Sequence, residues 1–282
     1  MKRNVGWITL LIALAGLPCY SAATSGGLPS DGMMHARSCE SFTLADTQGT
    51  QAKPAESSSM RAKVLLDRLR SELEPLMKRI VTHRYLDALE QGKVSREALK
   101  QLALQQYFIV TNGIRNIALL VSRFGDQPSR TALNGFLQAE YTVHDALMKF
   151  VRAVGLDEKA LAQGRVLPKA LMFSYFETFV CLYGSDADLI TAFYFDAQVW
   201  IKNAARVAKA LKTLYGFSPE DAAFFELYAN YQPAEKDVLP WMERALERSV
   251  TEHQIAEATR LLLEYELAFW DAMAETAGVA SK

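Results

Sequence analysis

The sequence predicts an all-α protein that forms a single bundle of about seven helices. From Met60 onward, apolar residues recur at spacings of three and four, which is the period of a helix that buries one face. Residues that begin helices recur along this region, with glycine and proline between the runs that they open. No run alternates apolar and polar residues long enough to form a strand, and the short connections favour one bundle.

Helix-start signals set the predicted boundaries. Ser95, Ser185 and Thr251 each precede an apolar periodic run and can accept a hydrogen bond from the backbone of the first turn. Glycines end the preceding runs, as at Gly92 and Gly184. The predicted helices cover residues 60–91, 95–123, 129–154, 166–183, 187–215, 219–248 and 251–277.

The composition is that of an ordinary globular protein. The chain has 282 residues, of which 50% are hydrophobic and 22% are charged. Its net charge of -1 gives no general attraction to nucleic acid or to anionic lipid. Cys19, Cys39 and Cys181 are too widely spaced to predict a zinc site or a disulfide framework.

The N-terminal part of the chain differs from the rest. Two basic residues precede an apolar run from Val5 to Leu17, so residues 1–23 are predicted to be a signal-peptide-like segment. The alternative is a later start of translation, at one of the methionines up to Met60. Residues 24–59 are rich in Ser, Gly, Thr and Ala, which predicts a disordered linker before a folded domain over residues 60–282.

One predicted helix carries a carboxylate and an imidazole on the same face. Glu140 and His144 lie four residues apart in the helix 129–154, so their side chains point the same way. A carboxylate and an imidazole placed like this can share a metal ion. The alternative is a hydrogen bond on the surface of the helix.

A second predicted helix contains a charge among apolar side chains. Asp196 stands within the apolar run Ala192–Trp200. Because an unpaired buried charge is costly, Asp196 needs a basic partner or a metal ion. The alternative to the metal is an ion pair with Lys202 or with an arginine of a neighbouring helix.

The stretch "FFELYANYQPAEKDVLP" has a polar face in apolar surroundings. Tyr228, Gln232 and Glu235 follow one another at i, i+4 and i+7, which is one face of a helix. Tyr228 can donate or accept a hydrogen bond, and Glu235 is a candidate metal ligand. Pro233 is expected to kink the helix at Gln232. The alternative is the end of a helix followed by a solvated turn.

Four stretches of the chain together resemble the motifs of a known superfamily. They are "THRYLDALEQGKVSREALKQLALQQYFIV", "FLQAEYTVHDALMKFVRAVGLD", "AFYFDAQVWIKNAARVAKALKTLYGFS" and "FFELYANYQPAEKDVL". In this order they resemble the haem-oxygenase-like superfamily of thiaminase II (TenA), PqqC and the non-haem di-iron oxidases. The similarity covers the chain from about Met60 to the C-terminus and implies one haem-oxygenase-like domain.

The resemblance also implies a metal site. Iron-dependent members use a Glu and a His of the third-helix motif, which match Glu140 and His144. They use a Glu of the central helix, where Asp196 stands. They use His, Asp and His of the last motif, where Tyr228 and Glu235 occupy the outer two positions. With these ligands replaced, the resemblance implies one iron ion rather than two, held by Glu140, His144, Asp196 and Glu235.

Two kinds of function follow from the resemblance. The first is an oxidoreductase of the non-haem iron type, an oxidase or oxygenase that acts with O2 on a small molecule, with Tyr228 as its catalytic side chain. The alternative is a metal-free enzyme or small-molecule binder like PqqC or TenA, or a non-catalytic family member. The central helix reads "FYFDAQ" and lacks the nucleophilic cysteine of thiaminase II.

The expected partners are a small-molecule substrate and O2. No nucleic-acid partner is expected, and whether the chain forms a homodimer is left open. The sequence contains no haem or nucleotide motif. The signal-peptide-like N-terminus indicates export to the periplasm, whereas the resemblance indicates the cytoplasm. Both locations therefore stay open.

Overall fold

A computed structural model describes residues 57–126, 129–229 and 231–280 of the chain. Throughout these residues the chain forms helices and no strand, which confirms the predicted all-α class. The short helix α6 is additional to the predicted ones. The elements are α2 (Ser58–Val81), α3 (Arg84–Glu90), α4 (Arg96–Arg123), α5 (Ser129–Ala153), α6 (Glu158–Gln163), α7 (Pro168–Tyr183), α8 (Asp186–Leu214), α9 (Ala223–Glu226), η2 (Glu235–Asp237), α10 (Leu239–Glu247) and α11 (Glu252–Thr276).

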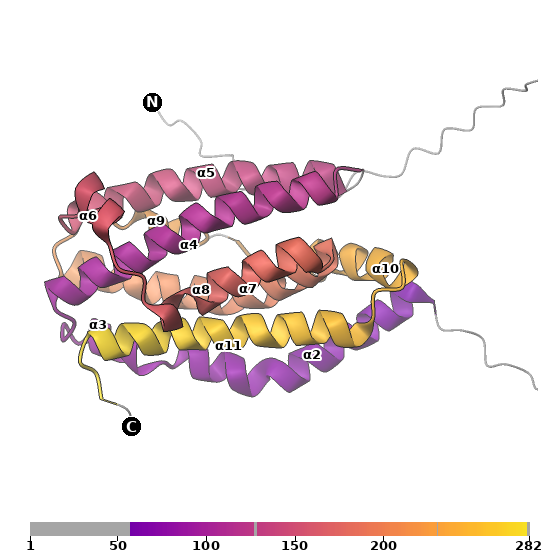
Figure 1. The fold of residues 1–282 in the computed structure, drawn as a ribbon. Coiled ribbons are helices and arrows are strands. Elements are labelled where there is room, and N and C mark those ends of the chain that lie inside the picture. Colours follow the sequence, from indigo (N-terminus) through magenta and orange to yellow (C-terminus); the bar gives the residue numbers. More distant parts are fainter. Residues whose placement is uncertain (1–56, 127–128, 230, 281–282) are drawn as a thin grey trace, which may run out of the picture.

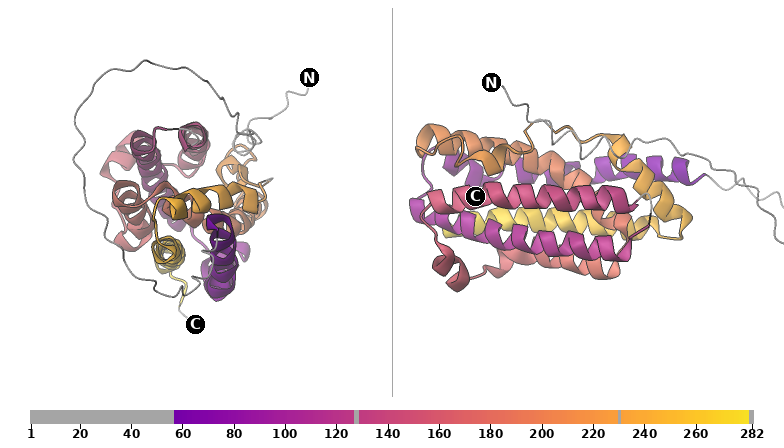
Figure 2. Two further views of the ribbon diagram at one scale, coloured as in Figure 1. Left: turned by 90° about the vertical axis from the view of Figure 1, so that its right-hand side faces the viewer. Right: turned by 90° about the horizontal axis from the view of Figure 1, so that it is seen from above.

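The long helices run side by side and form an elongated bundle (Figure 1). Seen along the helices, α4 and α5 lie on one side of the bundle, and α2 and α11 lie on the other (Figure 2). α8 is central, since it contacts α2, α3, α7, α9, α10 and α11. None of the described helices combines the length and the apolarity needed to cross a membrane. The predicted segment 1–23 and most of the predicted linker 24–59 lie outside the described residues.

Large aromatic and aliphatic side chains fill the core. Removing one such side chain from water contributes about 1.5–3 kcal/mol to the free energy of unfolding. The apolar faces of the helices therefore hold the bundle together. The largest fully buried side chains include Trp270, Tyr85, Phe150, Phe195 and Phe225.

The predicted helix caps form. The Ser95 hydroxyl accepts a hydrogen bond from the backbone N–H of Ala98 at 3.1 Å. Ser185 and Asp188 make a reciprocal pair, in which each side chain accepts from the other's backbone N–H, at 3.1 Å and 2.7 Å. The Thr251 hydroxyl caps α11 by accepting a hydrogen bond from the backbone N–H of Gln254 at 3.1 Å. Local sequence therefore decides where these three helices begin.

The predicted helix 60–91 is in fact two helices, α2 and α3. His83 stands between them in an extended conformation, and its Nδ1 accepts a hydrogen bond from the backbone N–H of Tyr85 at 3.2 Å. Its Nε2 lies 3.1 Å from Oδ1 of Asp271 in α11. His83 thus caps α3 and contacts α11, and the chain turns at this residue between α2 and α3. α2 also begins at Ser58, slightly before the predicted boundary.

The predicted helix 219–248 does not form. The chain makes the short α9, then a stretch without helix, the 3-10 turn η2, and finally α10. Pro233 explains the break, because it has no N–H to donate and disfavours the helical conformation at Gln232. Tyr228, Gln232 and Glu235 therefore do not share one helix face, and that prediction is wrong.

Candidate functional site

A cavity of about 260 Å³ lies inside the bundle. Side chains of α4, α5, α7, α8 and α11 form most of its wall, and the segment from α9 to α10 forms the rest. The wall is mainly apolar, as in most pockets for small molecules. Its apolar residues include Ile109, Phe136, Phe173, Phe193, Trp200 and Phe224.

Five carboxyl groups line this cavity, and four of them come from four different α-helices. These four belong to Glu140 of α5, Glu177 of α7, Asp196 of α8 and Glu266 of α11, and the fifth belongs to Asp237 of η2. Glu177 and Glu266 are only 3% and 5% exposed, whereas Glu140 and Asp196 are half-buried. No Lys, Arg or His is among the described residues that line the cavity. The acidic groups therefore have no basic partner in the described part of the wall.

Burial raises the pKa of the four helix-borne carboxyl groups, because it removes water from the charged form. The pKa of Glu140 rises to about 7 by burial alone. Burial, and then the nearby Glu140, raise the pKa of Glu177 to about 8. Burial raises the pKa of Glu266 to about 7, although the indole N–H of Trp270 donates to its Oε1 at 2.7 Å. The pKa of Asp196 lies well above its usual value through burial, and then through Glu266 and Glu177.

Gly113 of α4 lies beside two of these carboxyl groups. A β-carbon placed on Gly113 would lie 3.5 Å from Oε2 of Glu140 and 3.9 Å from Oε1 of Glu177. Oδ1 of Asp196 is buried and has no hydrogen-bond partner. A buried acceptor without a partner is costly, so this oxygen is a candidate contact for a ligand or for a proton.

Tyr228 lines the cavity beside the carboxyl groups. Burial raises its pKa, and the nearby Glu140 and Asp196 raise it further. The phenol therefore stays protonated at neutral pH and can donate a hydrogen bond. Tyr194 and Tyr231 also line the cavity, so hydroxyl groups accompany the carboxyl groups.

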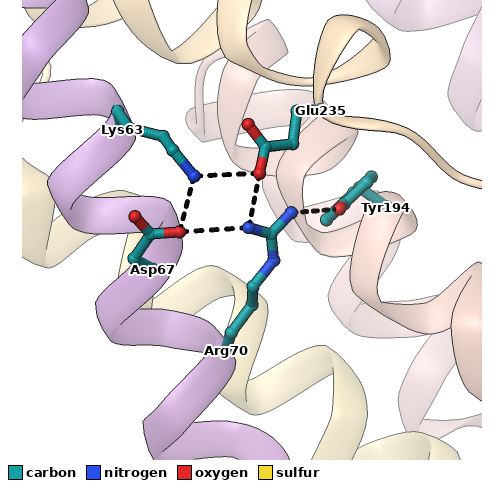
Figure 3. Close-up of polar contacts among 5 residues, drawn as sticks. All are labelled: Lys63, Asp67, Arg70, Tyr194 and Glu235. Atoms are coloured by element: carbon teal, nitrogen blue, oxygen red, sulfur yellow. Dashed lines mark hydrogen bonds and ion pairs between the residues drawn. The ribbon is translucent and has the colours of Figure 1, made fainter.

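A network of charges ties the segment before α10 to α2 (Figure 3). Oε1 of Glu235 accepts hydrogen bonds from Nζ of Lys63 at 2.9 Å and from Nη1 of Arg70 at 2.7 Å. Oδ1 of Asp67 accepts from the same two basic side chains at 2.8 Å and 3.0 Å. Nη2 of Arg70 also donates to the Tyr194 hydroxyl at 2.7 Å. Because Tyr194 lines the cavity, the network reaches from the surface to the site.

The sequence matches the TENA/THI-4/PQQC family over residues 70–277. The chain belongs to this family. None of the curated proteins matches the chain.

Solved structures show the fold of this TENA/THI-4/PQQC family member. A TenA homolog from Pseudomonas syringae pv. tomato str. DC3000 superimposes with a TM-score of 0.66 at 16% identity, over 82% of this chain and 100% of that one. A protein from Silicibacter sp. TM1040, called a TenA family transcription regulator, gives 0.59 at 21% identity, over 74% and 96%. A domain of unknown function with a heme oxygenase-like fold, from Shewanella denitrificans OS217, gives 0.59 at 14% identity, over 77% and 96%. The predicted haem-oxygenase-like fold is thus confirmed.

The fold does not bring the four predicted metal ligands of this family member together. Glu140 and Asp196 line the cavity, but His144 and Glu235 do not. His144 is half-buried on α5, with Nδ1 3.9 Å from Oδ1 of Asp145, and Glu235 binds the two basic side chains of α2. Among the described residues, no three His, Cys, Asp or Glu side chains are grouped so that they could hold a metal ion. The residues present do not fit the implied iron set, and iron binding stays a prediction.

The sequence analysis missed Glu177 and Glu266. Each is an acidic residue beside aromatic and aliphatic ones, in "FSYFETFVCL" and "YELAFW". This is the signal that singled out Asp196, and it could have found them. It could not have shown that the three side chains, together with Glu140, face one cavity, because that depends on how the helices pack.

Proposed function

We propose that this TENA/THI-4/PQQC family member binds a small organic cation with an aromatic or heterocyclic body, and exchanges protons with it without a metal ion. The supporting observation is the set of four helix-borne carboxyl groups, with Asp237 as a fifth, in a cavity whose described wall has no basic side chain. Ionised carboxyl groups so close together repel one another and are poorly solvated. Protons or a cation must neutralise them, and an organic cation also fits the apolar wall.

Aromatic rings beside the carboxyl groups support the same ligand class. The rings of Trp200 and Phe224 lie 6.0 Å apart with their planes inclined at 64°, and both line the cavity together with Phe173 and Phe193. A cation placed over an aromatic face gains about 0.5–2 kcal/mol. Rings and carboxyl groups together therefore favour a flat cation over a neutral or an anionic molecule.

The raised pKa values suit proton transfer. With pKa values of about 7, Glu140 and Glu266 are present in both protonated and ionised forms near neutral pH. A group poised in this way can act as a general acid or as a general base. Tyr228 adds a neutral hydrogen-bond donor to the same wall. These features favour an enzyme over a passive binder.

The iron-dependent oxidase or oxygenase stays the second candidate. It is favoured by the fact that Glu140 and Asp196 share one cavity, with Glu177 and Glu266 beside them. Carboxylates are ligands for divalent ions. Against it, the described side chains do not form a metal-binding group.

The proposal is tested with two probes of one shape, the cation benzylammonium and the neutral benzyl alcohol. Binding to the full chain is measured by isothermal titration calorimetry at neutral pH. We expect benzylammonium to bind at least about tenfold more tightly, because charge pairing is strong in a site of low dielectric constant. Glu140→Gln should weaken the binding of benzylammonium and leave that of benzyl alcohol unchanged, because Glu140, with a pKa of about 7, is partly ionised at neutral pH.

Glu74→Gln is the matched control, because Glu74 is exposed on α2 and does not line the cavity. Equal affinity for the two probes, or no binding of either, would contradict the proposal. Metal analysis after loading with Fe(II) without air tests the second candidate. One iron per chain in the wild type, and none in Glu177→Gln, would favour the oxidase instead.

A further inference from the structure

The fifth carboxyl group of the cavity differs from the other four. Asp237 belongs to η2 rather than to a long helix, and it lines the cavity. Its Oδ2 is engaged, since it accepts from the backbone N–H of Ala234 at 2.9 Å and from the Tyr231 hydroxyl at 3.5 Å. Its Oδ1 is buried and has no hydrogen-bond partner. Because Oδ2 closes a local turn, the carboxyl group is held in place with one oxygen unpartnered.

The neighbours of Asp237 separate it from the four helix-borne carboxyl groups. Burial raises the pKa of Tyr231, and the nearby Asp237 raises it further. Burial also raises the pKa of Tyr228, but there the nearby groups that add to the rise are Glu140 and Asp196. The two tyrosines therefore belong to two different polar groups on the wall of one cavity.

Tyr194 connects this second polar group to the charge network at the surface (Figure 3). Its hydroxyl accepts from Nη2 of Arg70 at 2.7 Å. Nη1 of the same guanidinium binds Glu235, which lies two residues before Asp237. The second polar group is thus built where the chain between α9 and α10 completes the wall, and the ion pairs with α2 hold that chain in position.

The unpartnered oxygen determines what this part of the wall can bind. A buried acceptor without a partner is costly, and a hydrogen-bond donor on a ligand removes that cost. The cavity of about 260 Å³ is smaller than the usual 300–1,000 Å³ of pockets for drug-sized ligands, so it suits one ring with short substituents. One such molecule can carry a charged group for the four carboxyl groups and a donor for Asp237.

We propose that Asp237 forms a second binding subsite, which takes a neutral hydrogen-bond donor, a hydroxyl or an N–H group, on the ligand whose cationic group meets the helix-borne carboxyl groups. This inference rests on the proposed function and narrows its ligand class to rings with two polar substituents. A ligand with an acceptor or an anionic group in this place is disfavoured, because that group would face a carboxyl oxygen.

The test compares two ammonium probes of nearly the same shape, hydroxybenzylammonium and methylbenzylammonium. Both the 3- and the 4-substituted pairs are titrated into the full chain by calorimetry at neutral pH. In at least one pair we expect the hydroxyl probe to bind at least about tenfold more tightly, because its hydroxyl gives the buried oxygen the partner that it lacks. The ratio of the two affinities is the readout, since the ammonium group is common to both probes.

Asp237→Asn should bring this ratio close to one. The amide oxygen can still accept from the backbone N–H of Ala234, and the amide N–H group then takes the place of Oδ1, so that two donors meet. Asp221→Asn is the matched control and should keep the ratio. Asp221 likewise accepts from a backbone N–H, that of Ser218 at 3.0 Å, but it is not among the described residues that line the cavity. Circular dichroism checks that every variant keeps its helices.

Glu140→Gln distinguishes the subsite from the cation site. It should weaken the binding of both ammonium probes and leave their ratio unchanged, because Glu140 belongs to the first polar group. Equal affinities of the two probes in the wild type for both pairs, or a ratio that survives Asp237→Asn, overturn the subsite and leave the proposed cation site standing. Binding of none of the ammonium probes overturns both proposals.

Discussion

Glu177 is a carboxyl group that the fold keeps protonated. Its pKa rises from 4.5 to about 8 through burial and through Glu140. The folded chain therefore binds this proton more tightly than the unfolded chain does. The resulting contribution to the free energy of unfolding is fully present below about pH 4.5 and is lost as the pH rises through about 8.

We expect Glu177→Gln to remove this loss of stability. A neutral amide of similar shape has no proton to lose, so the variant should gain stability over the wild type as the pH rises toward 9. The gain should reach a few kcal/mol at most, since one pKa unit corresponds to about 1.4 kcal/mol. Thermal unfolding followed by circular dichroism at several pH values measures it, with Glu74→Gln as the control. Parallel stability curves for the wild type and Glu177→Gln would refute this account of the site.

Gly113→Ala should weaken ligand binding without lowering the stability of the fold. Its methyl group would lie at ordinary contact distance from the carboxyl oxygens of Glu140 and Glu177, and it would occupy part of the cavity. Alanine is favoured over glycine within a helix by up to about 1 kcal/mol, so the fold should not be destabilised. We therefore expect at least about tenfold weaker binding of benzylammonium with an unchanged or higher melting temperature. Unchanged affinity would show that the probe does not reach this part of the wall.

At the scale of elements, the sequence predicts where helices begin better than where they break. The caps at Ser95, Ser185 and Thr251 are local, so the pattern alone finds them. The turn at His83 depends on a contact with α11, which no local pattern contains. Pro233 was expected to kink a helix, but it lies in a stretch with no helix to kink.

The stretch from Tyr231 to Val238 forms part of the cavity wall, and Glu235 connects it to α2. We expect Glu235→Gln to loosen this stretch without unfolding the bundle, because exposed ion pairs contribute little to global stability. Hydrogen exchange should become faster at the backbone amides of Asp237 and Val238, with a melting temperature close to that of the wild type.

Glu257→Gln is the matched control for this loosening. It removes an ion pair with Arg260 of similar exposure on α11, away from the cavity. Exchange at Asp237 and Val238 should stay unchanged in this variant. Equal exchange rates there in Glu235→Gln and in the wild type would show that the ion pairs do not hold the stretch.

At the scale of the whole molecule, the sequence predicts the fold, but it predicts the candidate site only in part. Apolar periodicity predicts the helices, and the order of four motifs predicts the superfamily. Both signals can be read from one sequence. Glu140 and Asp196 were found as isolated signals. Their meeting with Glu177 and Glu266 is a property of four packed helices, which no single stretch encodes. The resemblance directed attention to His144 and Glu235, which point elsewhere.

The acidic cavity as a whole should make cation binding depend on pH. Glu140 and Glu177 lose their protons near pH 7 and pH 8, and each ionisation adds a negative charge that attracts the ligand. Benzylammonium should therefore bind more tightly as the pH rises from 6 to 8, by up to about tenfold for each group that ionises. Calorimetry at both pH values measures the change. Benzyl alcohol should show none, and a decrease for benzylammonium would contradict the assigned charges.

The bond between Trp270 and Glu266 has an optical consequence. The indole of Trp270 donates to that carboxyl group, and the Trp200 ring lies 6.3 Å from the Trp270 ring with its plane inclined at 29°. Trp200 and Trp241 line the cavity itself. Indole emission shifts with nearby charge and with exclusion of water. We therefore expect the intrinsic emission of these tryptophans to change in wavelength and intensity when the cavity is protonated or filled, so no dye has to be attached.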